Sequence, residues 1–346
     1  MKFWLGASFA DTDQFVELAR AAERCGFDTL TLSDHLFYAD FATPYPYSRS
    51  GRPRWNARTH WPDVWVTIGA MAAVTSTLRF SPNVYIAPAR DLFTVAKQVS
   101  TAAVLSRERV TFGVGVGWCK EEFTGTGQDF HTRGRRLDAM LPLLRALWAG
   151  ETVELDGLPP LSISPTPAGP VPVYVGGDSE AALRRAARTG DGWIGNRIYT
   201  EEQFDVVLNT LRDRLTAHGR NDDGFEIIAP LAVLPDANTY RRFAAKGVTG
   251  TMAAPWWLAT PRRRPVTARA PSNSRSPPWS ASPRRSSPRC DSRPERARWG
   301  RSGQASRDDS LVSCWKRSQP PVTSPRCGRA GRCPAWSRPT TWARTS

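Results

Sequence analysis

The sequence predicts an α/β fold, a TIM or (β/α)8 barrel, and two observations support this prediction. Strand-like and helix-like segments alternate eight times within about 250 residues, which is the size and rhythm of this fold. Glycine and polar residues also stand at the carboxyl ends of the strand-like segments, where such barrels carry their active sites. A doubly wound open sheet is the alternative, but nothing along the chain marks a reversal of strand order.

The first half of the chain alternates apolar runs with amphipathic segments. Residues 2–9 form an aromatic and apolar run that predicts a buried strand. A helix over 13–24 follows because apolar residues recur at every third or fourth position, and Gly26 predicts its end. The next predicted elements are a strand over 29–32, a helix over 64–78, a strand over 80–87, a helix over 92–105 and a glycine-rich strand over 109–116.

The second half continues the alternation. A helix predicted over 133–149 gathers leucines and Trp148 on one side, and Gly190 predicts the end of another. The other predicted elements are strands over 170–175, 192–195, 225–234 and 247–253, and helices over 179–188, 201–218 and 238–245. After the last strand the sequence becomes arginine-rich from Arg262, so we expect the final helix of the barrel to be missing.

Composition divides the chain into two predicted domains, a barrel over 1–260 and a basic tail over 261–346. The tail carries 20 basic and 4 acidic side chains, whereas the first 260 residues carry 27 and 28. Pro, Ser and Arg make up more than half of the tail, which has only four Leu, Ile, Val or Phe residues. Such a segment buries too little apolar surface to fold, so we expect disorder there. The barrel is nearly neutral, which argues against nucleic-acid binding by the whole chain.

Cysteine and histidine spacing predicts neither a metal site nor a disulfide framework. Cys25 and Cys119 are the only cysteines before residue 261, no C-x-x-C pair occurs, and the tail has no histidine. The N-terminal apolar run ends at Asp11 and Asp13, too early for a signal peptide. No apolar stretch is long enough to span a membrane. These features predict a cytoplasmic protein.

The ends of five predicted strands carry the candidate site residues. Because parallel strands of a barrel end at one mouth, we expect them to lie together. They are Asp34 and His35; Asn83 and Val84; Gly113, Gly115 and Gly117; Gly176, Gly177, Asp178 and Ser179; and Gly195, Asn196 and Arg197.

Gly176 to Ser179 indicates a phosphate site. Two glycines allow a ligand close to the backbone, and Ser179 can cap a helix whose first N–H groups face the mouth. An ordinary strand–helix turn uses the same residues and is the alternative.

His35 is the candidate acid or base, since histidine exchanges protons near neutral pH, and Asp34 is the expected partner of its ring. A structural histidine at a strand end is the alternative. Residues 36–59 form a loop rich in aromatic side chains, which we call the aromatic loop, and Trp61 and Trp65 follow it. These aromatic side chains either form the wall of an apolar substrate pocket or pack the loop onto the barrel.

Several motifs together resemble the luciferase-like monooxygenase superfamily, and within it the class of oxidoreductases that depend on coenzyme F420, a deazaflavin. They extend over roughly residues 1–258. They include Thr-Leu-Ser-Asp-His at 31–35, Tyr-Pro-Tyr at 45–47, Gly-Val-Gly-Val-Gly-Trp at 113–118 with Glu-Glu-Phe at 121–123, Arg-Gly-Arg-Arg at 133–136, Val-Gly-Gly at 175–177 and Gly-Asp-Gly-Trp at 190–193.

The resemblance implies a TIM barrel that binds F420, or FMN as the alternative, and acts on a small molecule. It implies that His35 is the catalytic acid or base with Asp34 beside it, and that Asn83–Val84 is a cis peptide bond supporting the central ring. Gly115 and Gly117 match ring contacts, and Gly176, Gly177, Asp178 and Ser179 match the phosphate site. Trp118 replaces an acidic residue of the sugar-phosphate dehydrogenases, which argues against that substrate. Homodimers are common among such barrels.

Three other readings remain open. FMN-dependent monooxygenation is the alternative activity. Nucleic-acid binding through the tail, with its nineteen arginines and five tryptophans, is a second class of function, although a solvated tail explains the same composition. An inactive, aggregation-prone barrel is the third, because a missing last helix exposes apolar surface. The amino-acid composition of the tail also resembles the translation of a GC-rich gene in the wrong reading frame.

Overall fold

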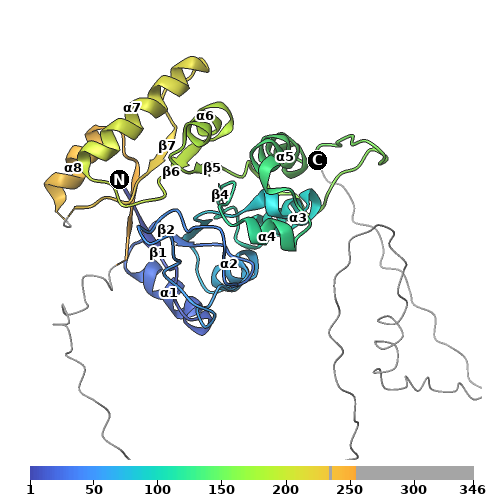
Figure 1. The fold of residues 1–346 in the computed structure, drawn as a ribbon, viewed down its shortest axis with the longest axis horizontal. Helices are drawn as coiled ribbons and strands as arrows, with labels where there is room; N and C mark the ends of the chain where they lie inside the picture. The colour runs from blue at the N-terminus through green and yellow to red at the C-terminus, as the bar shows by residue number, and fades with distance from the viewer. Residues whose placement is uncertain (234–235, 255–346) are drawn as a thin grey trace, which may run out of the picture. The chain divides into compact units, whose positions relative to one another are not determined.

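The computed structural model describes residues 1–233 and 236–254, which form a ring of eight parallel strands with helices outside it (Figure 1). The strands are β1 (Lys2–Gly6), β2 (Thr29–Leu32), β3 (Arg79–Pro82), β4 (Phe112–Val114), β5 (Val173–Gly176), β6 (Gly192–Ile194), β7 (Glu226–Ile228) and β8 (Gly250–Ala253). Their order is β3-β2-β1-β8-β7-β6-β5-β4. The predicted TIM barrel is therefore confirmed.

The ring closes between β3 and β4 through two parallel bridges, Phe80 with Val110 and Tyr85 with Val114. The two backbones pass very close here. A Cβ added to Gly113 would lie 2.0 Å from the carbonyl oxygen of Pro82, so only glycine fits at this position.

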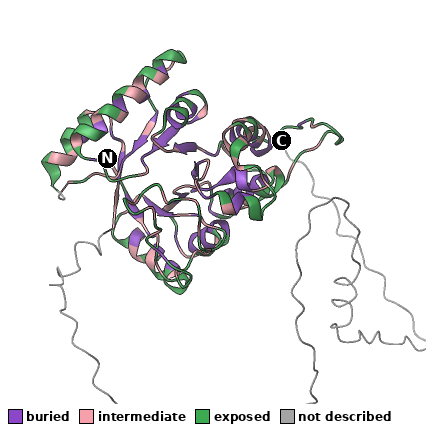
Figure 2. Ribbon diagram, viewed as in Figure 1, coloured by how far each residue is buried: buried purple, intermediate pink, exposed green. Residues whose placement is uncertain are grey.

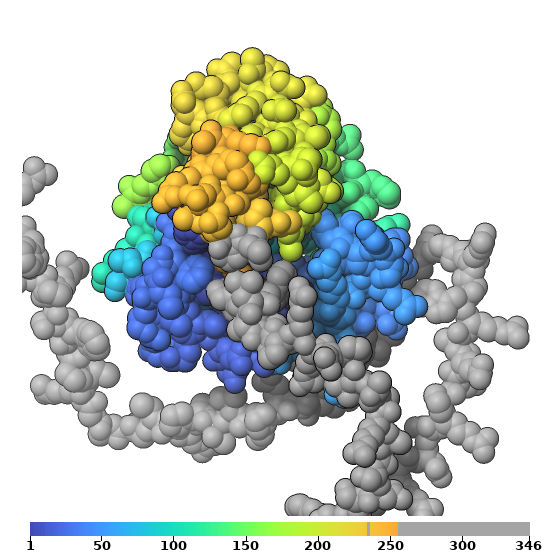
Figure 3. Space-filling model, turned by 90° about the vertical axis from the view of Figure 1, so that its left-hand side faces the viewer, coloured from blue at the N-terminus to red at the C-terminus, as the bar shows by residue number. Residues whose placement is uncertain are grey.

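Helices cover the outside of the ring, and their inner faces are buried while their outer faces are exposed (Figure 2). They are α1 (Phe15–Arg24), α2 (Val64–Ala72), α3 (Leu92–Leu105), α4 (Lys120–Gly125), α5 (Arg133–Trp148), α6 (Glu180–Thr189), α7 (Glu201–Ala217) and α8 (Ala237–Ala245). Figure 3 shows α7 and α8, in yellow and orange, packed side by side. The ring centroids of Phe204 in α7 and Phe243 in α8 lie 5.8 Å apart. Among these described helices, none combines the length and apolar character that a membrane span needs.

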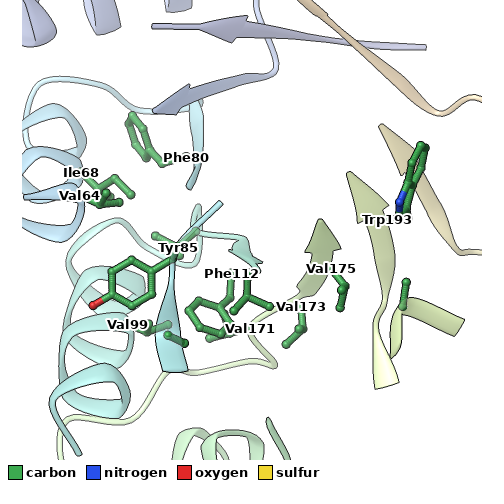
Figure 4. Close-up of a cluster of buried hydrophobic side chains, with 14 of the residues drawn as sticks. Val64, Ile68, Phe80, Tyr85, Val99, Phe112, Val171, Val173, Val175 and Trp193 are labelled. Carbon is green, nitrogen blue, oxygen red and sulfur yellow. The ribbon is translucent and has the colours of Figure 1, made fainter. Parts of the chain in front are cut away.

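The main core lies between the strands and the helices. Figure 4 shows Val64 and Ile68 of α2 near Phe80 of β3, with Tyr85 and Phe112 close by. Trp65 belongs to this core as well, since its ring centroid lies 5.3 Å from that of Tyr85. The expectation that Trp65 joins the aromatic loop is therefore wrong.

Several predicted bounds need correction. Most strands are shorter than their apolar runs, because the ladder of backbone hydrogen bonds ends before the apolar residues do. Thus the strands predicted over 2–9, 80–87, 109–116 and 225–234 reduce to β1, β3, β4 and β7. The helix predicted over 64–78 ends at Ala72, because the backbone N–H groups of 76–78 turn to the Glu23 carboxylate. Helix α4 was not predicted. The expected absence of a last helix and the tail both fall outside the described residues.

Candidate active site

The predicted clusters at 34–35, 83–84, 115–117 and 176 meet at the carboxyl ends of the strands. Val84 joins them: a Cβ added to Gly115 or to Gly176 would lie 2.5 Å from one of its two methyl groups. A Cβ on Gly117 would lie 2.6 Å from a methyl of Ile86. The Asn83–Val84 peptide bond is cis, as the resemblance implies. Val84 is therefore held between two glycines at the centre of the mouth.

The His35 ring forms a hydrogen bond with Glu122 and not with Asp34. Its Nδ1 lies 2.9 Å from Oε1 of Glu122, and the two side chains are only 9% and 3% exposed. The same oxygen accepts the backbone N–H of Leu36 at 2.9 Å. Glu122 comes from α4, a helix that the sequence pattern did not predict, although the Glu-Glu-Phe motif at 121–123 includes this glutamate. The expectation that Asp34 orients the His35 ring is thus wrong.

Asp34 instead forms a buried ion pair with Arg90. Its two oxygens accept bonds of 2.7 and 2.8 Å from the guanidinium, and the backbone N–H of Ile86 donates at 2.9 Å. Burial raises the pKa of Asp34. Burial would lower the pKa of Arg90, but the Asp34 charge raises it instead. The forked geometry favours the ion pair, so Asp34 ties the end of β2 to the loop after β3.

Four rings, Trp55, Trp61, Trp118 and Tyr45, form what we call the aromatic enclosure. Ring centroids of Trp55 and Trp61 each lie 4.7 Å from that of His35, and Trp118 lies at 5.9 Å. Tyr45 packs against Trp55 and Trp118 at 5.0 and 5.2 Å. The indole N–H groups of Trp55 and Trp61 are buried and have no hydrogen-bond partner within the described part of the chain. The His35–Glu122 pair therefore lies in an apolar surrounding.

The opposite side of the mouth, at β5 and β6, is polar. Gly177 adopts a φ of 114°, and the Ser179 hydroxyl caps α6 by accepting the N–H of Ala182 at 3.3 Å, as predicted. Arg197 and the Tyr199 hydroxyl both donate to the Asp178 carboxylate. Burial and the Asp178 charge raise the pKa of Tyr199, so its hydroxyl stays a donor. These side chains, with Gln203, border a cavity of about 250 Å³.

The aromatic loop reaches from β2 across to this polar side. The Tyr47 hydroxyl accepts a bond from the Asn196 side chain at 3.1 Å. Glu121 accepts the N–H groups of Ala42 and Thr43 at 2.8 and 2.9 Å. Burial alone would raise the pKa of Glu121, but the Thr43 bonds lower it to about 2, so this anion stays in place. The loop is thus fixed at both sides of the mouth.

No cluster of three or more His, Cys, Asp or Glu side chains within residues 1–233 and 236–254 is placed to hold a metal ion. The site therefore consists of one histidine–glutamate pair under aromatic rings and one polar edge at a helix N-terminus.

Comparisons with known proteins place the chain in a family. The family model of luciferase-like monooxygenases matches residues 4–311. An uncharacterised protein of Mycobacterium tuberculosis is 35% identical over 254 residues, 72% of this chain and 87% of the relative. The F420-dependent glucose-6-phosphate dehydrogenase of the same species is 31% identical over 237 residues, 64% of this chain and 65% of that protein.

The fold also matches solved structures. One is the F420-dependent tetrahydromethanopterin reductase from Methanopyrus kandleri, with a TM-score of 0.53 and 16% identity over 66% of this chain and 65% of that one. At this identity the likeness concerns the fold alone. The family match and the mycobacterial relatives decide the assignment: this chain belongs to the luciferase-like monooxygenase family and is an oxidoreductase of that type.

Proposed function

We propose that the protein is an F420-dependent oxidoreductase in which His35 moves a proton while hydride passes to or from a small organic substrate. The observation that carries the proposal is the pairing of His35 with Glu122 at the mouth of the barrel, inside the aromatic enclosure. The 31% identical F420-dependent relative supports the choice of cofactor.

The residues present fit a planar cofactor with a phosphate-bearing tail. Gly177 and Ser179 stand at the N-terminus of α6, whose free N–H groups and dipole favour an anion, and Arg197 stands beside them. We assign these residues to the phosphate, with Gly176 and Asp178 in the same turn. Val84, fixed between Gly115 and Gly176, and its neighbours Asn83 and Gly117 would support the ring. When bound, F420 supplies a two-electron hydride acceptor or donor.

The chain's own task is to position the substrate, exclude water and transfer the proton. Because Nδ1 of His35 is engaged by Glu122, Nε2 is the nitrogen left to exchange a proton with substrate. The Glu122 carboxylate fixes the orientation of the ring. Trp55, Trp61 and Trp118 surround the ring and keep water away from it.

Titration of the full-length protein with F420 and with FMN, followed by ligand fluorescence, tests the cofactor assignment. We expect F420 to bind and FMN to bind at least about tenfold more weakly. FMN as the tighter ligand would favour the monooxygenase alternative, and binding of neither would contradict both activities.

The role of His35 is tested with the variant His35→Ala, using a panel of small apolar alcohols and aldehydes and the absorbance of F420. We expect F420 affinity to persist while turnover falls by about 100-fold or more, the usual contribution of a general acid or base. Glu122→Gln should reduce turnover by about tenfold, because a hydrogen bond to a neutral amide holds the ring less firmly than one to a carboxylate. His131→Ala, an exposed histidine outside the site, is the control and should change neither quantity.

A further inference from the structure

A second cavity, of about 370 Å³, opens on the outer side of the aromatic enclosure. Phe9, Arg54, Arg58 and His60 are among its lining residues. The Phe9 ring packs against Trp61 at 5.4 Å and against Trp55 at 6.3 Å. Both indoles also pack against His35 at 4.7 Å. Phe9 and the two tryptophan rings therefore lie between this cavity and His35.

The cavity lining is rich in hydrogen-bond donors. The backbone N–H of Thr12 donates to Nδ1 of His60 at 2.9 Å, so the proton of the neutral ring sits on Nε2. One guanidinium nitrogen of Arg54 donates a hydrogen bond to the carbonyl oxygen of Tyr47 at 2.9 Å. Its other N–H groups are left to bind a ligand. The Arg58 side chain has no ion pair or hydrogen bond with any described residue.

The charge of the lining selects a particular anion. Arg54 and Arg58 contribute two positive charges, and Asp11 is the sole carboxylate among the described lining residues. Its side chain is 65% exposed and lies 3.9 Å from His60. The lining therefore carries a net charge of +1. A monoanion neutralises this charge, whereas a phosphate dianion would leave an excess of negative charge. Planar guanidinium groups also match the two oxygens of a carboxylate.

We propose that this cavity is a carboxylate subsite on the outer side of the aromatic enclosure, which takes an apolar monocarboxylate, with Arg58 and Arg54 holding the carboxylate and Phe9 contacting the apolar body. The subsite does not depend on the proposed function, because Phe9 and the two tryptophan rings lie between it and His35. The basic groups and the aromatic wall belong to segments 9–12 and 54–61, which lie on the β1–β2 side of the mouth and outside the polar edge assigned to the cofactor.

Isothermal titration of the full-length protein with sodium hexanoate and with 1-hexanol, a neutral probe with the same chain length, tests the subsite. We expect hexanoate to bind more tightly than hexanol and its affinity to fall as salt is raised. Arg58→Gln should weaken hexanoate binding by about fivefold or more and leave hexanol binding unchanged. Arg49→Gln, which removes an exposed arginine of the same loop outside the cavity, is the matched control and should have no effect.

Asp11→Asn provides a gain-of-binding test that does not depend on a damaged protein. Removing the single opposing charge should tighten hexanoate binding by about twofold to threefold. Equal affinity for hexanoate and hexanol, an unchanged affinity in Arg58→Gln, or an equal loss in Arg49→Gln would overturn the proposal. The titrations contain no cofactor. Hexanoate binding without F420 binding would therefore remove the proposed function alone, whereas F420 binding without hexanoate binding would remove the subsite alone.

Discussion

The two ends of the barrel satisfy their polar groups in different ways. At the base, where helices lead into strands, Glu23 of α1 accepts the N–H groups of Ser76, Thr77 and Leu78 at 2.7, 2.6 and 3.0 Å. Arg109 is buried there and donates to carbonyl or hydroxyl oxygens of four residues at 2.6 to 3.0 Å, namely Ala72, Thr75, Leu78 and Ser106. The base is thus closed by its own hydrogen bonds.

At the mouth, several buried polar atoms have no partner within the described residues. They are the indole N–H groups of Trp55 and Trp61 and the side-chain oxygen of Asn196. Unsatisfied donors and acceptors cost stability when they are buried, so they persist where something other than stability is selected. The comparison teaches that changes at the base should alter stability alone, whereas changes at the mouth should alter binding and turnover.

The largest effect on stability is expected from Arg109→Leu at the base. The variant leaves the buried carbonyls of Ala72, Thr75 and Leu78 without their donor, which should cost about 3 kcal/mol of unfolding free energy. Urea denaturation followed by circular dichroism measures it. Arg24→Leu, an exposed arginine at the end of α1, is the control and should cost little. A small loss in Arg109→Leu would mean that the base is not held by this side chain.

A mid-sized effect is expected from Gly115→Ala at the mouth. The added methyl would lie 2.5 Å from a methyl of Val84, a β-branched residue with little rotamer freedom, so we expect a loss of about 1–3 kcal/mol. Because Val84 moves, F420 affinity should also fall. Gly69→Ala in α2 meets nothing within 4 Å and should raise stability by about 0.5–1 kcal/mol without changing F420 affinity. Unchanged affinity in Gly115→Ala would argue against Val84 as the ring support.

The smallest effect is the pH dependence that Glu23 gives to the base. Hydrogen bonds from the backbone of Thr77 and Leu78 lower the pKa of Glu23 from 4.5 to about 2. The stabilisation is therefore complete above pH 4.5 and is lost as the pH falls from 4.5 to 2. Glu23→Gln should lower the melting temperature at pH 7 by a few degrees, and the difference from wild type should shrink at pH 3. A difference that stays constant with pH would contradict this role. Glu17→Gln on the same helix is the control.

The alternation of apolar runs with amphipathic segments was sufficient to predict the eight strands, because a strand of the barrel is buried on both of its faces. Their lengths could not be predicted, since apolar residues such as Val110 and Val116 continue beyond the two ends of β4. The meeting of 34–35, 83–84, 115–117 and 176 followed from topology alone, because parallel strands of one barrel end at the same rim.

The partner of His35 could not be predicted from neighbouring residues. Asp34 adjoins it in sequence, but successive residues after a strand point in different directions, and Asp34 turns to Arg90. Glu122 lies 87 positions away on a short helix with weak sequence signals. The pair is a product of tertiary packing, and only the Glu121-Glu122 motif after the glycine-rich strand hinted at it.

The close approach of β3 and β4 also limits how this sequence can evolve. A methyl group at position 113 would have to displace the Pro82 carbonyl, and that displacement would separate the two strands at the place where the circle of strands is completed. Natural variation can therefore explore the rings over His35 and the arginines around the outer cavity, while position 113 stays invariant in any descendant that keeps a closed circle.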